Sequence, residues 1–585
     1  MQLRPLSLAA VSALVASGAW YTYKGDGSPA GAVSNGALQQ NRGLSSSSYP
    51  EASASPKTPS ATGDEAQVSR KALVVDNDQI YTGSIIGDGP LSKDVDDSGR
   101  KIVEMMTPDQ ATEKIRKTEE SYIIDRGRGV VRYDLATLPS NDPIEDDHAE
   151  KIVEVPSSVN ETETSASSSD WMFWGVFDGH SGWTTSAKLR QVLISFVARE
   201  LNSTYKAAST AAANGSHFPS PVAIDTAIKT AFTRLDNEIC HESVAKLSKA
   251  PSKRLAAELL APALSGACAL LSFYDTSSKT LRVACTGDSR AVLGRRNPQT
   301  GKWSATALSV DQTGSNTAEA DRMRSEHPAS EAATVIRNGR VLGNLEPSRA
   351  FGDAFYKWSK ETQDKLKRNF FGRTPHPLLK TPPYVTAEPV ITTTQIQPEN
   401  GDFLVMATDG LWEMLTNEEV IGLVGQWIET QNRHSSSSNS SSWLPSWFSS
   451  QSSSLPVEKG GNTSKKGSSG SEEPPIRQQQ WGTDQLPASQ YNQRFAVEDK
   501  NAASHLIRNA LGGKDRDMVC ALLTLPSPYS RRYRDDLTVE VIFFGETPGG
   551  KQNASGNVTV NHEATAGGHE NGNANGQKSD LKPKL

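Results

Sequence analysis

The sequence predicts an α+β fold in which helices pack over antiparallel β-sheets. Short apolar runs typical of strands outnumber the helical patterns along the 585 residues. The helical patterns fall in pairs between groups of strands, as expected for helices laid over antiparallel sheets. Short acidic motifs adjoin most of the strand runs, so chemistry is expected at the ends of the strands.

The ordered part of the chain is expected to begin near Lys71, with an apolar run at 72–75. A helix is predicted to start at Thr107 and to extend to Ser121. Thr107 is the expected N-cap, proline follows in the first turn, and Gln110 completes a capping box.

The segment from Met172 to Phe177 predicts a buried strand that ends in an Asp-Gly-His turn. Two amphipathic helices are predicted after it, because apolar residues recur at helical spacing. We assign these residues to the core and give them no catalytic role. They are Leu189, Leu193, Phe196, Val197 and Leu201 in the first helix, and Ile224, Ile228, Phe232, Leu235 and Ile239 in the second.

The second half of the chain continues the strand-rich pattern, and its apolar runs are bounded by polar turns. A helix is predicted over 418–430, where it leads into a serine-rich tract. The predicted strands cover residues 267–274, 281–285, 291–294, 403–407 and 537–544.

Three tracts lack the bulky apolar residues that a folded core requires. We therefore divide the chain into a targeting segment with a disordered linker at 1–70, a catalytic domain at 71–545 and a disordered tail at 546–585. A serine-rich, disordered insertion near 434–475 interrupts the domain. Its aromatic residues Trp443, Trp447 and Phe448 fit either a docking element or a tolerated loop insertion.

Residues 5–23 are apolar or small, follow Arg4 and precede the first acidic residue, Asp26. They fit a secretory signal, an N-terminal membrane anchor or a mitochondrial presequence. The segment is barely long enough to span a bilayer, and its alanine and serine content weakens its hydrophobicity. The four cysteines show no CxxC spacing, which predicts a reducing compartment without zinc or thiol chemistry. We favour an import segment, with a retained anchor as the alternative.

The charge distribution argues against a nucleic-acid partner. The formal net charge is −6, and no basic run stands out along the chain. Nucleic-acid-binding proteins normally carry a clustered basic surface.

Acidic motifs are the strongest functional signal in the sequence. Carboxylates at strand ends are hard oxygen ligands suited to Mg²⁺ or Mn²⁺. Their number predicts a metal-assisted reaction on a phosphoester. The motifs lie at 145–146, 178–180, 287–290, 409–410 and 534–536.

The same regions resemble the metal-dependent serine/threonine protein phosphatases of type 2C. The resemblance runs from about Thr107 to Phe544, and the motifs follow the order of that family. A single Asp-Gly-His is weak evidence, whereas five ordered motifs are hard to produce by chance. The resemblance implies an α-β-β-α sandwich of two antiparallel sheets flanked by helices, with metals at one end. The matching segments are 177–182, 287–291, 348–353, 407–412 and 534–539.

Several details resemble the pyruvate dehydrogenase phosphatase branch of the family. They are the segments 141–146, 347–353 and 382–389, and the Trp412-Glu413 pair. This resemblance implies a mitochondrial location, in the matrix or the intermembrane space, which agrees with the N-terminal segment. The implied partner is the pyruvate dehydrogenase complex, whose phosphorylated alpha subunit would be dephosphorylated and reactivated.

The resemblance further implies a centre of two Mg²⁺ or Mn²⁺ ions. Asp178 would bridge both ions, and Asp409 and Asp535 would hold one of them. Glu145 and the Gly179 carbonyl would hold the other.

The remaining acidic residues and one histidine receive supporting or catalytic roles from the resemblance. Asp146 would orient the metal-bound water, and His180 would protonate the leaving oxygen as general acid. Asp288 and Glu413 correspond to ligands of a third, looser metal. Simpler roles stay open, because His180 can merely shape its turn and Asp288 can brace its own. Asp353 and Asp536 are expected to support the site through hydrogen bonds.

The chain departs from the wider family at two positions. Asn141 stands where many members have a phosphate-binding arginine, so that role is unassigned. Arg126, Arg128 and Arg132 are candidates by proximity in sequence alone. Glu413 stands where aspartate is usual, which keeps the ligand type but alters its reach.

Three alternative functions can be set against this interpretation. A type 2C phosphatase could act on another organellar phosphoprotein, because loops rather than the metal cluster select the substrate. A catalytically silent scaffold would have lost metal ligands, and the ligand positions here are intact. A metal-dependent nuclease fits neither the acidic charge balance nor the motif order.

Overall fold

The computed structural model describes residues 69–545 and 557–567. Its longer gaps lie at 156–168, 212–217, 438–454 and 459–473, and it has further gaps of one to three residues.

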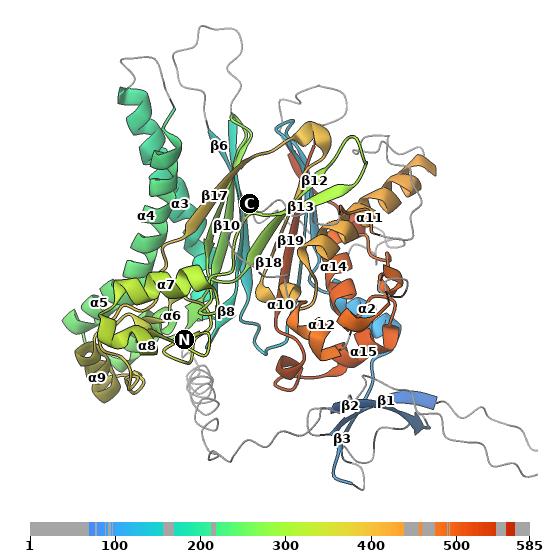
Figure 1. The fold of residues 1–585 in the computed structure, drawn as a ribbon, viewed down its shortest axis with the longest axis horizontal. Coiled ribbons are helices and arrows are strands. Elements are labelled where there is room, and N and C mark those ends of the chain that lie inside the picture. The colour runs from blue at the N-terminus through green and yellow to red at the C-terminus, as the bar shows by residue number, and fades with distance from the viewer. Residues whose placement is uncertain are drawn as a thin grey trace, which may run out of the picture.

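Two antiparallel sheets face each other at the centre of the structure (Figure 1). The strand order is β17-β11-β10-β7-β6 in the first sheet and β13-β12-β18-β19-β5-β4-β20 in the second. This architecture confirms the predicted α+β sandwich. The first sheet contains β6 (Asp147–Val155), β7 (Ser169–Phe177), β10 (Ala269–Asp275), β11 (Thr280–Thr286) and β17 (Val390–Gln395). The second contains β4 (Glu120–Asp125), β5 (Val130–Leu138), β12 (Arg290–Arg296), β13 (Trp303–Ala307), β18 (Phe403–Ala407), β19 (Leu537–Phe544) and β20 (Asn557–Val560).

Strand β7 is apolar throughout because both of its faces are covered. Trp174 and Val176 belong to the core between the two sheets. Phe173 and Phe177 alternate with them and pack into the core under the helices of the first sheet. A strand buried on both faces has a continuous apolar run, whereas a half-exposed strand alternates polar and apolar residues.

Helices cover the outer face of each sheet (Figure 1). The apolar residues predicted for the two helices after the Asp-Gly-His turn are in the core, except that Phe196 is only partly buried. The helices over the first sheet are α3 (Thr184–Ala211), α4 (Pro221–Asn237), α5 (Ser243–Lys249) and α6 (Lys253–Leu264). Those over the second are α2 (Pro108–Arg116), α11 (Asn417–Ser437), α14 (Ala502–Ala510) and α15 (Arg516–Thr524).

The first predicted helix, α2, starts as expected but ends early. Thr107 and Gln110 form the reciprocal capping box. The helix stops at Arg116, not at Ser121, because the next residues form β4. Tyr122 of β4 pairs with Tyr133 of β5, and their rings stack with centroids 4.9 Å apart. Sheet pairing therefore outweighs local helix propensity here.

A separate subdomain is formed by residues 313–389, which we call the α7–α9 subdomain. It contains α7 (Thr317–Glu326), α8 (Ala332–Val335), the hairpin of β14 (Ile336–Arg337) and β15 (Arg340–Val341), and α9 (Lys360–Asn369). Its own core includes Met323, Val335, Val341 and Tyr384. Sequence patterns did not predict it.

Two smaller sheets complete the described structure. Strands β8 (Gly179–His180), β9 (Gly266–Ala267) and β16 (Phe351–Gly352) form one of them, in the order β16-β9-β8. Strands β1 (Ser69–Asp76), β2 (Gln79–Ile86) and β3 (Lys101–Glu104) form the other, below α2 and α15 in Figure 1.

Parts of two segments predicted to be disordered are folded. Strand β20, within the predicted tail at 546–585, extends the second sheet by pairing with β4. In the insertion, the Pro456 carbonyl accepts the Trp303 N–H at 2.8 Å, so this short segment lies against β13. The prediction is wrong for these pieces, because an edge strand binds a short partner through its backbone whatever the local composition. The other domain boundaries stay a prediction.

Several predicted features cannot be compared with the structure. The N-terminal segment 5–23 and the aromatic residues Trp443, Trp447 and Phe448 lie outside the described residues. Within the described part, no helix is long and apolar enough to cross a membrane. The four cysteines are buried free thiols.

Candidate metal centre

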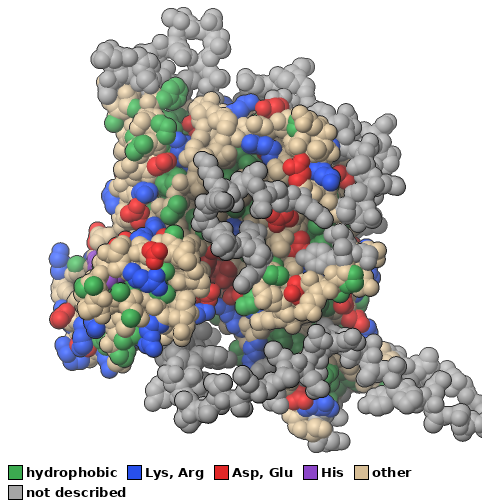
Figure 2. All heavy atoms as spheres, in the orientation of Figure 1, with side chains coloured by type: hydrophobic (Ala, Val, Ile, Leu, Met, Phe, Trp, Pro, Cys, Tyr) green, Lys and Arg blue, Asp and Glu red, His purple; other side chains and the backbone are tan. Residues whose placement is uncertain are grey.

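The sheet pairing brings four of the acidic motifs to one end of the sandwich. Asp147, at the start of β6, pairs with Phe177 at the end of β7. Ala407, at the end of β18, pairs with Val539 near the start of β19. The motifs that adjoin these strand ends therefore meet at the same edge. Figure 2 shows acidic side chains gathered in a central hollow of the molecular surface.

Three carboxylates form the centre of this site. Ligand oxygens of Asp178, Asp288 and Asp409 all lie within 4.8 Å of one another. Burial and the Asp146 and Asp288 charges hold the pKa of Asp178 well above its usual range. Burial and the Asp178 charge do the same to the pKa of Asp409. Burial and Asp409 raise the pKa of Asp288 to about 7. Buried like charges are unfavourable unless a cation offsets them, and these oxygen donors fit Mg²⁺ or Mn²⁺.

The structure places Asp288 in this group through a tight turn. The Cys268 thiol donates to the Asp288 carboxylate with Sγ and Oδ1 3.1 Å apart. Gly287, before it, has φ of +109°, and a Cβ there would collide with Cys268. Glycine is therefore required for this approach.

Glu145 and Gly179 are neighbours through their backbones. A Cβ at Gly179 would collide with the Glu145 carbonyl, so only glycine fits at this position. The Ser186 hydroxyl donates to the same carbonyl at 2.5 Å. Burial raises the pKa of the Glu145 carboxyl, and the Arg531 charge opposes that shift. The backbone proximity is compatible with the predicted pairing of Glu145 with the Gly179 carbonyl.

Asp536 organises the loop before Glu145, which confirms its expected supporting role. Its Oδ1 accepts the backbone N–H groups of Ser140 at 2.5 Å and Asn141 at 2.8 Å. Its Oδ2 accepts the Glu145 N–H at 2.9 Å and the Asn141 side-chain amide at 3.1 Å. Both the backbone N–H and the side-chain amide of Asn141 are thus bound to Asp536.

Asp146 is buried and connected to the turn that carries Asp409. The Thr408 hydroxyl donates to Asp146 Oδ2 at 2.9 Å and accepts the Thr538 N–H at 3.0 Å. Burial and the charge of Asp536 raise the pKa of Asp146 well above its usual range. The carboxylate is therefore fixed beside the three aspartates.

Asp535 and Glu413 lie at the margin and are bound by arginines. Arg531 Nη1 forms an ion pair with Asp535 Oδ1. Arg477 Nε lies 3.0 Å from Glu413 Oε2, and the Glu413 charge contributes to the raised pKa of Asp409. Arg477 belongs to α12 (Ile476–Trp481), which follows the serine-rich insertion.

The structure pairs His180 with Asp353, a contact that the sequence alone did not predict. The Nε2 atom of His180 lies 2.5 Å from Asp353 Oδ2. Burial alone would lower the pKa of His180, but Asp353 outweighs it and the pKa rises to about 9. Gly266 of β9 lies between β8 and β16, and a Cβ on it would collide with both side chains. Asp353 has φ of +45°, an unusual backbone conformation for a non-glycine residue.

The arginines proposed from sequence proximity do not reach this site. Arg126 and Arg128 both pair with the buried Asp170, at 2.6 Å and 3.1 Å. Arg132 is buried and pairs with Asp134 at 2.7 Å. These hypotheses are wrong because each guanidinium is already paired with a buried carboxylate.

The sequence analysis missed Arg531, whose charge lowers the pKa values of Glu145, Asp178 and Asp409.

A second group of potential ligands contains its own histidine–carboxylate pair. His148, Glu150 and Glu540 offer atoms within 4.8 Å of one another. His148 Nδ1 lies 2.7 Å from Glu150 Oε1, and burial followed by the Glu150 charge holds the pKa of Glu540 well above its usual range. Burial alone would raise the pKa of Glu150, but the charge of His148 and its hydrogen bond outweigh burial and lower that pKa to about 2. We therefore assign this group a structural role.

Comparison with known proteins gives consistent matches. The family model described as protein phosphatase 2C matches residues 150–442, which include Asp178, His180, Asp288 and Asp409. A protein phosphatase 2C homologue of Schizosaccharomyces pombe is 44% identical over 75% of this chain and 85% of its own. Mitochondrial pyruvate dehydrogenase phosphatase 1 of Saccharomyces cerevisiae is 42% identical, covering 77% of this chain and 75% of its own. The human protein of that name is 30% identical, covering 75% and 83%.

Among solved structures, the serine-threonine phosphatase 2C of Toxoplasma gondii is 15% identical with a TM-score of 0.33. It covers 70% of this chain and 99% of its own. With so low a score, this match supports no conclusion about the site.

If the three aspartates hold divalent cations, metal should stabilise the folded protein. We expect Mn²⁺ to raise the melting temperature, because ligand at ~100 times its Kd adds ~2.7 kcal/mol to the free energy of unfolding. Asp178→Asn should lose this shift, while its metal-free melting temperature should equal or exceed that of the wild type. Thermal unfolding with Mn²⁺ and with chelator measures both effects.

A matched control is Asp321→Asn, which changes an exposed aspartate paired with Arg324 on α7. This variant should retain the full Mn²⁺ shift. An unchanged shift in Asp178→Asn would show that the ions bind elsewhere.

Proposed function

Because the chain belongs to the protein phosphatase 2C family and is thereby a serine/threonine protein phosphatase, we propose that it uses Mg²⁺ or Mn²⁺ to dephosphorylate pyruvate dehydrogenase in mitochondria. The observation that carries the metal dependence is the group of three carboxylates, the buried Asp288 and the half-buried Asp178 and Asp409, within 4.8 Å of one another.

The substrate and location are proposed from two independent lines. Relatives at 42% and 30% identity, each matched over most of its length, are named mitochondrial pyruvate dehydrogenase phosphatases. The N-terminal segment 5–23 fits mitochondrial import. Dephosphorylation of the alpha subunit would reactivate the complex. Assembly of the acidic motifs into one site disfavours the scaffold alternative.

The chain offers more ligands than the three central carboxylates. Glu145, the Gly179 carbonyl and Asp535 complete, with Asp178 and Asp409, the set proposed for two ions. Asp288 and Glu413 are available for a third. Divalent cations in such a site lower the pKa of a water molecule and offset charge on the transferring phosphoryl group.

Two of the chain's own residues are proposed to handle protons. Asp146 would accept a hydrogen bond from the attacking water, held in place by the Thr408 hydroxyl at 2.9 Å. His180 would act as general acid on the leaving oxygen. Its Nε2 faces Asp353 at 2.5 Å, which leaves the proton on Nδ1 for transfer.

The first test of this function is a substrate assay. With Mn²⁺, the full chain should release phosphate from the phosphorylated alpha subunit of pyruvate dehydrogenase and from para-nitrophenyl phosphate. Chelator should abolish both activities. Asp178→Asn should lower them by about a hundredfold or more, because even changes next to metal ligands cost ~10–100-fold.

Each other outcome points to one alternative. Turnover of para-nitrophenyl phosphate but not of pyruvate dehydrogenase would indicate another phosphoprotein. Degradation of DNA or RNA would indicate a nuclease. Absence of any metal-dependent turnover would indicate a catalytically silent scaffold.

The general-acid role of His180 predicts a dependence on the leaving group. His180→Ala should slow hydrolysis of a phosphoserine peptide by ~10²–10⁴-fold, because the serine alkoxide needs a proton to leave. Hydrolysis of para-nitrophenyl phosphate should fall far less, because nitrophenolate leaves unprotonated. Steady-state rates on both substrates give the ratio, with the exposed His241→Ala as control. Equal losses on both substrates would argue for a merely structural His180.

Arg531 is proposed as the residue that binds the phosphate of the substrate. It forms an ion pair with Asp535 at the margin of the acidic group, and its side chain is 44% exposed. A guanidinium at the rim can contact an anion that enters from solvent and can donate two hydrogen bonds to it. The arginine position used by other family members is taken by Asn141, which is bound to Asp536.

Arg531→Ala should raise KM for a phosphopeptide about tenfold, and it should raise the inhibition constant of inorganic phosphate in parallel, because both anions use the same donors. Arg531→Lys should recover part of the loss. Arg532→Ala, a neighbouring exposed arginine, is the matched control. Unchanged phosphate inhibition in Arg531→Ala would exclude a direct contact with phosphate.

A further inference from the structure

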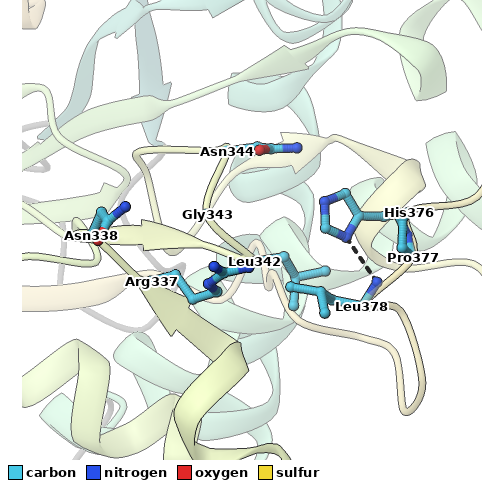
Figure 3. Close-up of a pocket in the computed structure, with 8 residues that line it drawn as sticks. All are labelled: Arg337, Asn338, Leu342, Gly343, Asn344, His376, Pro377 and Leu378. Atoms are coloured by element: carbon cyan, nitrogen blue, oxygen red, sulfur yellow. Dashed lines mark hydrogen bonds between the residues drawn. The ribbon is translucent and has the colours of Figure 1, made fainter. Parts of the chain in front are cut away.

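The α7–α9 subdomain contains an open cavity of about 350 Å³ (Figure 3). Arg337 and Asn338, from the β14–β15 hairpin, and the loop 342–344 line one side. The segment 376–378 lines the other. The cavity lies outside the acidic centre, and no residue of that centre lines it.

One cationic side chain of the cavity, Arg337, forms no ion pair within the described part of the chain. Arg337 is exposed, and within the described part of the chain no ion pair or hydrogen bond of its guanidinium is seen. The nearby Arg340 differs, because it pairs with Glu346 at 2.5 Å. In Figure 3 the Arg337 side chain extends between the hairpin and the segment that carries His376.

The other polar groups of the cavity can also donate hydrogen bonds. His376 Nδ1 accepts the Leu378 N–H at 3.2 Å, so the ring proton is on Nε2. Burial and the charge of Arg337 lower the pKa of His376, so the imidazole is a neutral donor. The Asn338 and Asn344 side chains are exposed and add two amides. Leu342 and Leu378 supply the apolar part of the lining.

The backbone that frames the cavity is strained and firmly held. Asn338 and Gly339 have φ of +50° and +72°, as in the tight turn of a two-residue hairpin. Leu342 also has a positive φ, +50°, although its side chain is 98% buried. Its N–H donates to the Val335 carbonyl at 2.9 Å. Strain of this kind persists where the surroundings impose it, often at ligand sites.

The same subdomain is tied to the catalytic histidine. Arg349 pairs with Glu319 of α7 at 2.8 Å, and a few residues later Asp353 binds His180. Strand β16, between them, pairs with β9, which in turn pairs with β8. A polypeptide held at the cavity is therefore bound to the element that positions His180.

We propose that this cavity binds an acidic side chain of the phosphoprotein substrate, on the same polypeptide as the phosphorylated residue. The proposal rests on the proposed phosphatase function and adds a determinant of substrate choice. A guanidinium, an imidazole N–H and two amides favour a carboxylate over a neutral or cationic group. The open cavity has room for one side chain of a passing segment.

The test uses phosphoserine peptides that differ at one position. A single glutamate or glutamine is placed at successive positions on either side of the phosphoserine, and KM and kcat are measured with the full chain and Mn²⁺. We expect glutamate at one or a few neighbouring positions to lower KM about tenfold with little change in kcat. Arg337→Gln should erase this preference, and Arg337→Glu should transfer it to a lysine peptide.

Two controls separate this proposal from the proposed function. Para-nitrophenyl phosphate has no carboxylate for the cavity to bind, so its hydrolysis should be the same in all Arg337 variants. Arg324→Gln alters an exposed arginine of α7 paired with Asp321, and it should keep the glutamate preference. Absence of turnover by the wild type would refute the phosphatase function itself. Turnover without a glutamate preference, or a preference that survives Arg337→Gln, would overturn the role of the cavity.

Discussion

Repulsion among closely spaced carboxylates is the constraint on which this structure depends. Asp178, Asp288 and Asp409 come from different strand ends, yet their oxygens lie within 4.8 Å of one another. Such proximity is unfavourable in a low-dielectric environment unless protons or cations offset the charge. The sandwich supplies the energy that holds them together, through paired strands and a core on both faces of each sheet. A bound cation would offset this repulsion, in line with the metal dependence of the protein phosphatase 2C family.

Glycines and hydrogen-bonding side chains around the centre allow its backbone segments to approach and hold them in place. Gly179 and Gly287 allow backbone segments to approach that any Cβ would separate. Asp536 collects backbone and side-chain donors from the 140–145 loop, so this loop is fixed before any ion binds. Thr408 couples Asp146 to the turn of Asp409. Preorganisation of this kind reduces the reorganisation needed during reaction.

The α7–α9 subdomain connects substrate choice to chemistry. Part of it packs around a core of its own, while Phe351, Trp358 and Leu366 pack into the core under the first sheet. Its exposed loops can therefore differ among relatives without disturbing the metal centre. Its link to the active site passes through Asp353 and His180 across the small sheet of β8, β9 and β16. The cavity of this subdomain, where the Arg337 guanidinium forms no ion pair with the residues that the structure describes, therefore lies where it can select substrates without taking part in the reaction.

The sequence alone determined the fold class, the boundaries of β18 and β19, the capping box of α2 and the motifs that converge at the centre. These features depend on local periodicity, on capping side chains and on the meaning of acidic residues at strand ends. Tertiary structure decided the early end of α2, the strand β20 in the predicted tail, the pairing of His180 with Asp353 and the neutralisation of Arg126 by Asp170. Each of these is a contact between residues distant in sequence, and the partner of a charged side chain or an edge strand is fixed only when the chain has folded.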